Sequence, residues 1–150
     1  MLAITFRSYR AADREACLAI FDDNCPEFFA PNERDDYIEF LAQDSGAYTI
    51  VTLGNAVVGA YGLLPHRDGL ALRWILFSRA TQGQGLGGRV MARVLDEMRA
   101  RAAVLHIAAS HKSAPFFARF GAREVQTIRD GWGPGMDRVD MQLTVNGNTA

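Results

Sequence analysis

The sequence predicts an α/β protein whose helices pack in layers around one β-sheet. Segments rich in β-branched and aromatic residues alternate with segments of helical periodicity, in the order β-α-α-β-β-β-α-β-α-β-β. Of the 150 residues, 49% are hydrophobic and 22% are charged, a balance that supports a buried core and excludes a disordered chain. We expect a single domain over residues 1–150, with a flexible tail at 146–150.

The first half of the chain predicts a strand, two helices and a hairpin. The strand is expected at 3–7, the first helix from Asp13, the second helix after Asn32, and the hairpin strands at 48–53 and 56–64. Pro26 and Pro31 separate the two helices, and Asn32 is a suitable N-cap for the second. Gly54-Asn55 is typical of a tight hairpin turn.

The second half predicts a strand, a long helix, a strand, a short helix and a last pair of strands. These are expected at 70–77, 86–101, 103–109, 113–120, 125–128 and 139–145. Apolar residues at 86, 90, 91, 94, 95 and 98 give the long helix the clearest period of the sequence. A glycine-rich turn over 131–135 joins the last two strands, which are expected to include a sheet edge at 139–145 where two copies could pair.

Charge and cysteine content exclude several classes of protein. With 16 basic and 17 acidic side chains the net charge is −1, so we expect no overall basic nucleic-acid binder. Cys17 and Cys25 are too few for a disulfide scaffold, and no cysteine lies near the three histidines, so no metal site is predicted. No apolar run is long enough to span a membrane and the N-terminus lacks the apolar core of a signal peptide, so we expect a cytoplasmic protein.

The glycine cluster Gln82-Gly-Gln-Gly-Leu-Gly-Gly88 lies between a predicted strand and the long helix. Glycines let backbone N–H groups approach a ligand closely, and a helix N-terminus adds unpaired donors and positive partial charge. The cluster therefore predicts a phosphate or pyrophosphate site. A tight turn alone would explain one such glycine but not four within six positions.

Two other phosphate-binding motifs fit this cluster poorly. Gly83, Gly85 and Gly88 match the G-x-G-x-x-G of dinucleotide-binding proteins, but residues 78–81 separate them from the strand and residues 105–110 contain no acid for a ribose. A P-loop is excluded because no Gly-Lys-Ser/Thr follows.

Two motifs, one helix and one strand apart, agree with a single family. Gln82, Gly85 and Gly87 match the signature Gln/Arg-x-x-Gly-x-Gly/Ala, and Phe116-Phe117 followed by Gly121 matches an aromatic pair with x-x-x-Gly. In both, and in its order of elements, the sequence resembles the GNAT superfamily of N-acetyltransferases over nearly its whole length. The resemblance implies a mixed, mostly antiparallel central sheet with a splay between the fourth and fifth strands and helices on both faces.

The resemblance further implies transfer of an acetyl group from acetyl-CoA to a primary amine by direct attack, without a metal. The pantetheine arm would lie in the splay against the main chain of Ile75 and Phe77, and the glycine N–H groups would hold the pyrophosphate. The N–H near Phe77 could stabilise the developing oxyanion. The residues expected to bind acetyl-CoA are Ile75, Phe77, Gln82, Gly83, Gln84, Gly85, Gly87, Gly88, Ser110 and Phe117.

The family's usual acid and base are both missing from their positions. Phe117 stands where the family often has a tyrosine that protonates the thiolate, so Ser113 or Ser110 is the candidate donor; a thiol of pKa about 8.5 also leaves unaided near neutral pH. The strand 70–77 has no acid where the family often has a glutamate, so His111 is the predicted base. His66 is a further candidate, and His106 is expected to be a core histidine.

The acceptor site is expected between the two N-terminal helices, the fourth strand and the 131–135 loop. Phe29, Tyr37, Trp74 and Trp132 are its predicted aromatic walls, with Phe28 beside them. Between Asp22 and Glu39 there are seven acids and one base, which could attract a cationic amine to the mouth.

Two functions remain open from the sequence. The first is an N-acetyltransferase acting on a small amine or a peptide amine, as a monomer or a homodimer. The second is a catalytically weak or inactive acyl-CoA sensor, which the missing tyrosine and glutamate favour.

Overall fold

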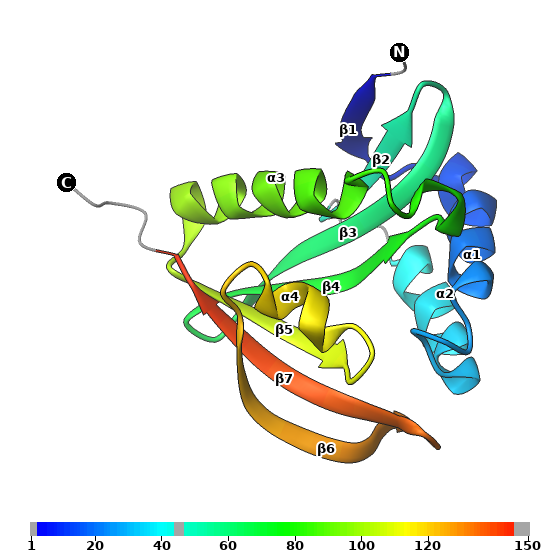
Figure 1. Ribbon diagram of the computed structural model, residues 1–150. Helices are drawn as coiled ribbons and strands as arrows, with labels where there is room; N and C mark the ends of the chain where they lie inside the picture. Colours follow the sequence, from blue (N-terminus) through cyan, green and yellow to red (C-terminus); the bar gives the residue numbers. More distant parts are fainter. Residues whose placement is uncertain (1–2, 44–46, 146–150) are drawn as a thin grey trace.

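The computed structural model describes residues 3–43 and 47–145 and contains a seven-stranded sheet in the order β1-β2-β3-β4-β5-β7-β6 (Figure 1). The strands are β1 (Ile4–Ser8), β2 (Tyr48–Leu53), β3 (Ala56–His66), β4 (Gly69–Phe77), β5 (Val104–Ser110), β6 (Arg123–Gly133) and β7 (Met136–Thr144). The helices are α1 (Arg14–Asp23), α2 (Arg34–Ala42), α3 (Leu86–Arg101) and α4 (Ala114–Ala118), with 3₁₀ turns η1 (Ala11–Asp13), η2 (Pro31–Glu33) and η3 (Arg79–Thr81). All neighbouring strands are antiparallel except β4 and β5, which are parallel.

Helices cover both faces of this sheet and bury two separate clusters of apolar side chains. On one face, α3 and Phe117 of α4 pack over the sheet, because the apolar residues of α3 recur on one side of the helix. On the other face, α1 and α2 bury Phe21, Tyr37 and Leu41 against β2, β3 and β4. The predicted fold class, a mixed sheet with helices on both faces, is confirmed.

The splay between β4 and β5 begins in the middle of β4. The two strands pair only from Leu70 to Leu72 and diverge beyond that point (Figure 1). On the other edge of β4, the partners change from Gly62↔Arg73 to Ala60↔Leu76, so β4 contains one residue more than β3 over this interval. Trp74 lies in this bulge with a φ of 50°, which is unfavourable for a side chain of its size.

The bulge also reverses the direction of the side chains along β4, so that alternate residues before and after it point to opposite faces of the sheet. Leu70 and Leu72 belong to the cluster under α3, whereas Leu76 and the Trp74 ring belong to the cluster under α1 and α2. A regular strand would place all four side chains on one face. The extra residue therefore turns Trp74 away from α3 and toward the N-terminal helices.

The observed elements match the predicted ones closely, with three corrections. Asn32 is not an N-cap: it lies within η2, where the Glu33 carboxylate instead accepts the Ala30 N–H at 2.7 Å. The last two strands are longer than predicted, because they pair into the glycine-rich turn as far as Gly133↔Met136. The edge strand is β6, since β7 lies between β5 and β6. The predicted tail at 146–150 lies outside the described residues.

Candidate active site

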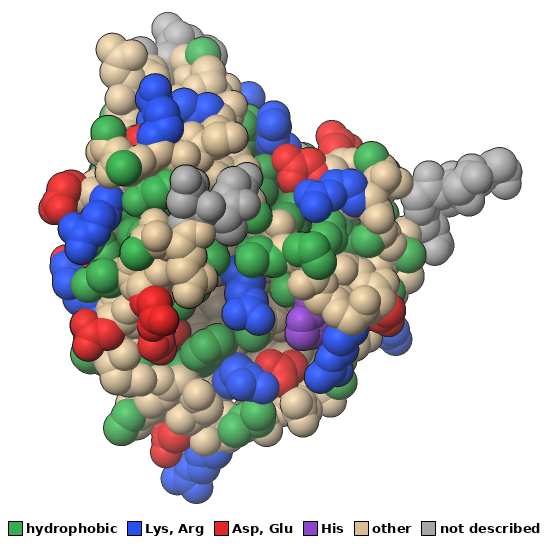
Figure 2. All heavy atoms as spheres, turned by 180° about the vertical axis from the view of Figure 1, so that it is seen from behind, with side chains coloured by type: hydrophobic (Ala, Val, Ile, Leu, Met, Phe, Trp, Pro, Cys, Tyr) green, Lys and Arg blue, Asp and Glu red, His purple; other side chains and the backbone are tan. Residues whose placement is uncertain are grey.

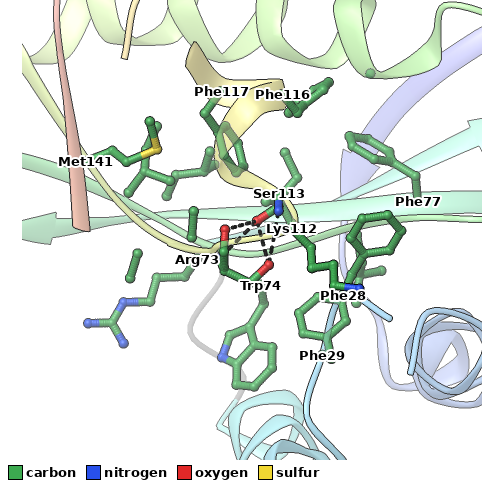
Figure 3. A pocket seen from close by; sticks show the side chains of 18 of the residues that line it. Phe28, Phe29, Arg73, Trp74, Phe77, Lys112, Ser113, Phe116, Phe117 and Met141 are labelled. Carbon is green, nitrogen blue, oxygen red and sulfur yellow. Dashed lines mark hydrogen bonds between the residues drawn. The ribbon is translucent and has the colours of Figure 1, made fainter. Parts of the chain in front are cut away.

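A cavity of about 950 Å³ occupies the splay and reaches both faces of the sheet. It is lined by the segment between α1 and α2, the second half of β4, the glycine turn, the end of β5, α4 and the β6–β7 hairpin. Figure 3 shows Phe116 and Phe117 on one side of β4, and Arg73 and Trp74 on the other. The cavity therefore joins two compartments through the opening between β4 and β5.

The first compartment ends at the glycine turn before α3. Within the described chain, the N–H groups of Gly83, Gly85 and the first helical residues 86–88 donate to no carbonyl. Apart from Leu86, these residues are glycines, and all of them line the cavity. The turn therefore offers a cluster of free backbone donors at a helix N-terminus, which suits a phosphate group.

The four glycines of this turn differ in why a side chain is disfavoured at each position. Gly83 and Gly85 have φ of 83° and 76°, which favour glycine. A Cβ at Gly87 would lie 2.7 Å from the Phe116 ring, whereas a Cβ at Gly88 would meet nothing within 4 Å. Backbone geometry and packing thus account for three of these glycines, whereas the sequence analysis expected a tight turn to explain only one. Neither backbone geometry nor packing requires glycine at position 88.

The open edge of β4 is fixed from the side of α1. Asn24 is buried at the end of α1, and its Nδ2 donates to the Phe77 carbonyl at 2.8 Å and to the Ile20 carbonyl at 2.8 Å. This pair of hydrogen bonds ties the helix to the strand at the mouth of the splay. Ile75 and Phe77 both line the cavity there.

At the end of β5, two serines face the cavity and one histidine does not. Ser110 and Ser113 line it, with their hydroxyl oxygens 3.1 Å apart and with the Ser110 N–H donating to Ser113 Oγ at 3.0 Å. Phe117 packs beside them and is 3% exposed. His111 is exposed and is not part of the cavity lining, and its Nδ1 accepts the Asp137 N–H at 3.1 Å.

Aromatic side chains form one wall of the second compartment. Phe28, Phe29 and Trp74 gather below β4 in Figure 3, and the Phe29 and Trp74 rings stack with centroids 6.2 Å apart. Tyr37 does not line the cavity, because it is completely buried behind Trp74 with its hydroxyl bonded to Tyr48. Tyr37 was predicted in the cavity wall, but it lies one layer behind that wall.

The tip of the β6–β7 hairpin closes this compartment from the opposite side. Trp132 lines the cavity, its Nε1 donates to the Ala109 carbonyl at 2.9 Å, and its own carbonyl accepts Asn32 Nδ2 at 2.7 Å. A Cβ at Gly133 would collide with the Asn32 side chain. The hairpin tip and η2 thus meet above the cleft.

A sequence model of the acetyltransferase (GNAT) family matches residues 17–122, which is more than half of the chain. The chain belongs to the GNAT family. This family transfers acetyl groups from acetyl-CoA, and the prediction of a GNAT acetyltransferase with acetyl-CoA as its co-substrate is confirmed.

Solved acetyltransferase structures share the fold of nearly the whole chain. A GNAT-family protein from Desulfovibrio desulfuricans has 24% sequence identity and a TM-score of 0.76, covering 95% of this chain and 99% of that one. The ribosomal-protein-S18-alanine N-acetyltransferase of Escherichia coli has 19% identity and a TM-score of 0.77, with 95% and 94% covered. The yncA protein of Salmonella typhimurium, solved with its cofactor acetyl-CoA, has 18% identity and a TM-score of 0.73, with 99% and 97% covered. No curated protein matches the sequence at a significant level.

The residues predicted to bind acetyl-CoA in this GNAT domain are brought together, with one exception. Gln84 does not line the cavity, and its side chain donates to the Ala80 carbonyl instead. The other nine line it: Ile75, Phe77, Gln82, Gly83, Gly85, Gly87, Gly88, Ser110 and Phe117. Their roles toward acetyl-CoA stay predictions.

Sequence reasoning missed a buried acid of the acceptor compartment. Glu33 is 5% exposed, lines the cavity, and uses Oε2 to accept the Ala30 N–H, while no bond to Oε1 is present among the described residues. Burial raises the pKa of Glu33 to about 7, and the charge of Asp36 adds to the rise while the Ala30 hydrogen bond opposes it. The signal in the sequence was a glutamate three residues after Ala30, at the start of a helix with Pro31 in its first position.

The charges around the cleft differ from the expectation of an acidic mouth. Glu33 is the only acid between Asp22 and Glu39 that lines the cavity, and other acids of this segment face basic side chains on the surface, as in Asp22–Arg34 and Glu27–Arg79.

His106 is not a core residue: it lines the cavity, and its Nε2 lies 2.7 Å from Asp68 Oδ1. Odd and even residues of β5 face opposite sides of the sheet, and its buried side is that of Leu105 and Ile107.

No group of three or more His, Cys, Asp or Glu side chains among the described residues is placed to hold a metal ion. Among the helices of residues 3–43 and 47–145, none has the length and apolar character needed to cross a membrane.

Proposed function

We propose that this GNAT protein moves the acetyl group of acetyl-CoA to a primary amine by direct attack within the β4–β5 splay. One observation carries the proposal: the free donors of the glycine turn and the aromatic acceptor cleft belong to one continuous cavity that passes between the two strands. Such a cavity admits a phosphate-bearing thioester from one face and an amine from the other.

The residues of the first compartment fit acetyl-CoA. Backbone N–H groups of Gly83, Gly85 and residues 86–88 would hold the pyrophosphate, because open space stands beside Gly83, Gly85 and Gly88, where side chains would otherwise be. The main chain of Ile75 and Phe77 would pair with the pantetheine arm, since β4 has no strand partner on the β5 side beyond Leu72. Bound there, acetyl-CoA supplies an activated acyl group with a thiol as leaving group.

Glu33 is the proposed general base. An attacking amine must first lose a proton, and a base is most effective when its pKa lies near the working pH. The Glu33 carboxylate lies in the acceptor compartment, keeps one oxygen out of any hydrogen bond within the described chain, and has its pKa raised to about 7 by burial. His111, the candidate from the sequence, stays a second proposal, because it lies outside the cavity lining.

Ser113 is the proposed proton donor to the departing thiolate. Its hydroxyl lies at the cavity wall where β5 ends, next to the Ser110 hydroxyl at 3.1 Å. Phe117 offers no hydroxyl at the position where the family often has a tyrosine. A serine hydroxyl is a weak acid, so we expect this group to assist the departure by a hydrogen bond.

The test is release of free CoA thiol from acetyl-CoA in the presence of amines, amino acids and peptides, with CoA binding measured by calorimetry. Amine-dependent thiol release would support the transferase. Tight CoA binding without turnover by any acceptor would overturn it in favour of an acyl-CoA sensor. Absence of CoA binding would refute the assignment of the glycine turn as well.

A further inference from the structure

The acceptor compartment is lined by side chains of both charges and by aromatic rings. Glu33 is an acid of this lining. Arg73 lines the same compartment from β4, immediately before Trp74, and Figure 3 shows it extending away from the Phe28, Phe29 and Trp74 group. A molecule in this compartment therefore meets a carboxylate, an apolar wall and a guanidinium.

Arg73 has no acidic partner among the described residues. Some other arginines are paired with acids, including Arg138 in the same cavity, whose Nε lies 2.9 Å from Asp140 Oδ1, whereas Arg67, which also lines the cavity, forms no ion pair within the described chain either. Arg73 stands in the strand bulge beside Trp74, so the local backbone is held by the ladder to β3 and by the Tyr48 hydroxyl, which donates to the Trp74 carbonyl at 2.7 Å. Within residues 3–43 and 47–145 its five N–H donors form no hydrogen bond, and the side chain originates from a well-fixed strand.

Further basic side chains lie close to Arg73. His66, Arg67 and His106 also line the cavity, and the His66 and His106 rings lie 4.8 Å apart. The pKa of His66 is lowered, first by burial and then by His106, Arg67 and Arg73, which places these groups within electrostatic reach of one another. Figure 2 shows Lys and Arg side chains and a His side chain near the hollow of this face, with acidic side chains beside them. Two acids lie at this end: Asp68, which is bonded to His106, and Asp140, which is paired with Arg138.

We propose that the acceptor is an amino carboxylate with an apolar side chain, held by its carboxylate at Arg73 and by its amine at Glu33. The proposal rests on the acetyltransferase function proposed above and names its substrate class. A guanidinium binds a carboxylate through two parallel N–H···O bonds, which fixes the direction of the molecule as well as its charge. The aromatic wall of Phe29, Trp74 and Trp132 then receives the apolar side chain.

The same charges disfavour other amines. A diamine or polyamine would bring a second cation toward Arg73 and Arg67, and a simple alkylamine would leave Arg73 unpaired. Only an acceptor with both charges can pair with both Glu33 and Arg73.

The experiment compares acceptors that differ only in the anionic group: L-phenylalanine with phenethylamine and L-phenylalaninamide, and L-leucine with isoamylamine. Rates are compared at equal concentrations of unprotonated amine. We expect kcat/KM for each amino acid to exceed that for its uncharged partner by roughly ten- to a hundred-fold, as for a charge-assisted hydrogen bond. Arg73→Gln should remove this preference, and Arg73→Lys should keep part of it.

Arg101→Gln is the matched control, because Arg101 is exposed at the end of α3 and does not line the cavity. Equal rates for charged and uncharged acceptors, or a preference that survives Arg73→Gln, would overturn the proposal. Preference for a polyamine would overturn it as well.

A binding titration separates this proposal from the acetyltransferase function. L-phenylalanine and phenethylamine are titrated into wild-type and Arg73→Gln protein by calorimetry, with and without CoA. Arg73-dependent binding of the amino acid supports the acceptor class even if no acetyl transfer occurs. Lack of any such binding refutes it, even if another amine is acetylated.

Discussion

Glu33 combines a structural hydrogen bond with a position in the wall of the acceptor compartment. Its Oε2 accepts the Ala30 N–H and so fixes the start of η2 and α2, while the carboxyl group is 5% exposed. Replacement by glutamine keeps an oxygen for the Ala30 N–H but removes the ability to take a proton. Glu33→Gln therefore separates the structural role from the chemical one.

We expect Glu33→Gln to lower kcat/KM by about 100-fold, the usual contribution of a general base. The limb of the wild-type pH–rate profile near pH 7 should disappear, because the group that titrates there is gone. Steady-state rates between pH 5 and 9 measure both effects. His111→Ala serves as the comparison: if that variant suffers the loss and Glu33→Gln does not, His111 is the base.

The same side chain predicts how stability depends on pH. The pKa of Glu33 is about 7 in the folded protein against 4.5 for an ordinary glutamate, so the folded state binds this proton more tightly. Its contribution to the free energy of unfolding must then fall as pH rises from 4.5 to 7 and stay constant above. We expect Glu33→Gln to gain stability relative to wild type across this interval, as measured by urea unfolding at several pH values. A difference independent of pH would contradict the buried, proton-binding carboxyl group.

At the scale of elements, the first turn of α3 offers two neighbouring glycines with different constraints. A Cβ at Gly88 meets nothing within 4 Å, and alanine favours a helix by about 1 kcal/mol over glycine. Gly88→Ala should therefore keep or raise Tm while weakening CoA binding, because its methyl group enters the space meant for a phosphate.

Gly87→Ala is the matched variant of the same turn. Its methyl group would lie 2.7 Å from the Phe116 ring, so we expect a lower Tm from the displaced contact between α3 and α4. Thermal unfolding and CoA calorimetry on both variants test this. Unchanged CoA affinity in Gly88→Ala would argue against phosphate binding at this turn.

The contact between η2 and the hairpin tip gives a second prediction at this scale. Asn32→Ala removes the donor to the Trp132 carbonyl, an exposed bond, so the free energy of unfolding should change by no more than about 1 kcal/mol. The KM for the acceptor should rise, and amide hydrogens over 131–135 should exchange faster, because the tip loses its link to η2. Thr127→Ala, which removes another exposed hydrogen bond from β6, should change neither quantity. Unaltered exchange at the tip would show that Trp132 is held by its bond to Ala109 alone.

The whole molecule consists of two apolar layers on one sheet, and the cavity crosses the sheet between them. A ligand that fills the splay bridges β4, α3 and the end of β5, so its binding energy adds to the stability of the whole fold. At 100 times its Kd, CoA should stabilise the protein by about 2.7 kcal/mol, and Tm should rise by roughly 5 to 10 °C. Thermal scans with CoA and with NAD measure this. A comparable shift with NAD would revive the dinucleotide interpretation of the glycine turn.

Much of the fold follows from local patterns. The apolar period of residues 86–101 and the Gly54-Asn55 turn reproduce α3 and the β2–β3 hairpin, because helix and hairpin formation depend on neighbours within a few residues. The bulge at Trp74 could not be predicted in this way. The bulge arises because β4 has one residue more than β3 over the paired interval, and the pattern of apolar residues in β4 does not reveal this difference.

The sequence by itself determined the order of the elements, the glycine turn with its free donors, and the two motifs that place the chain in the GNAT family. Tertiary structure alone decided the acceptor compartment: Asn32 meets Trp132 across 100 residues, Tyr37 falls behind Trp74, and Glu33 and Arg73 come to line the same cavity. The physical reason is that a phosphate cradle is made of consecutive backbone groups. The acceptor cleft is made of side chains from distant segments, whose positions depend on strand register and on which face of the sheet each segment covers.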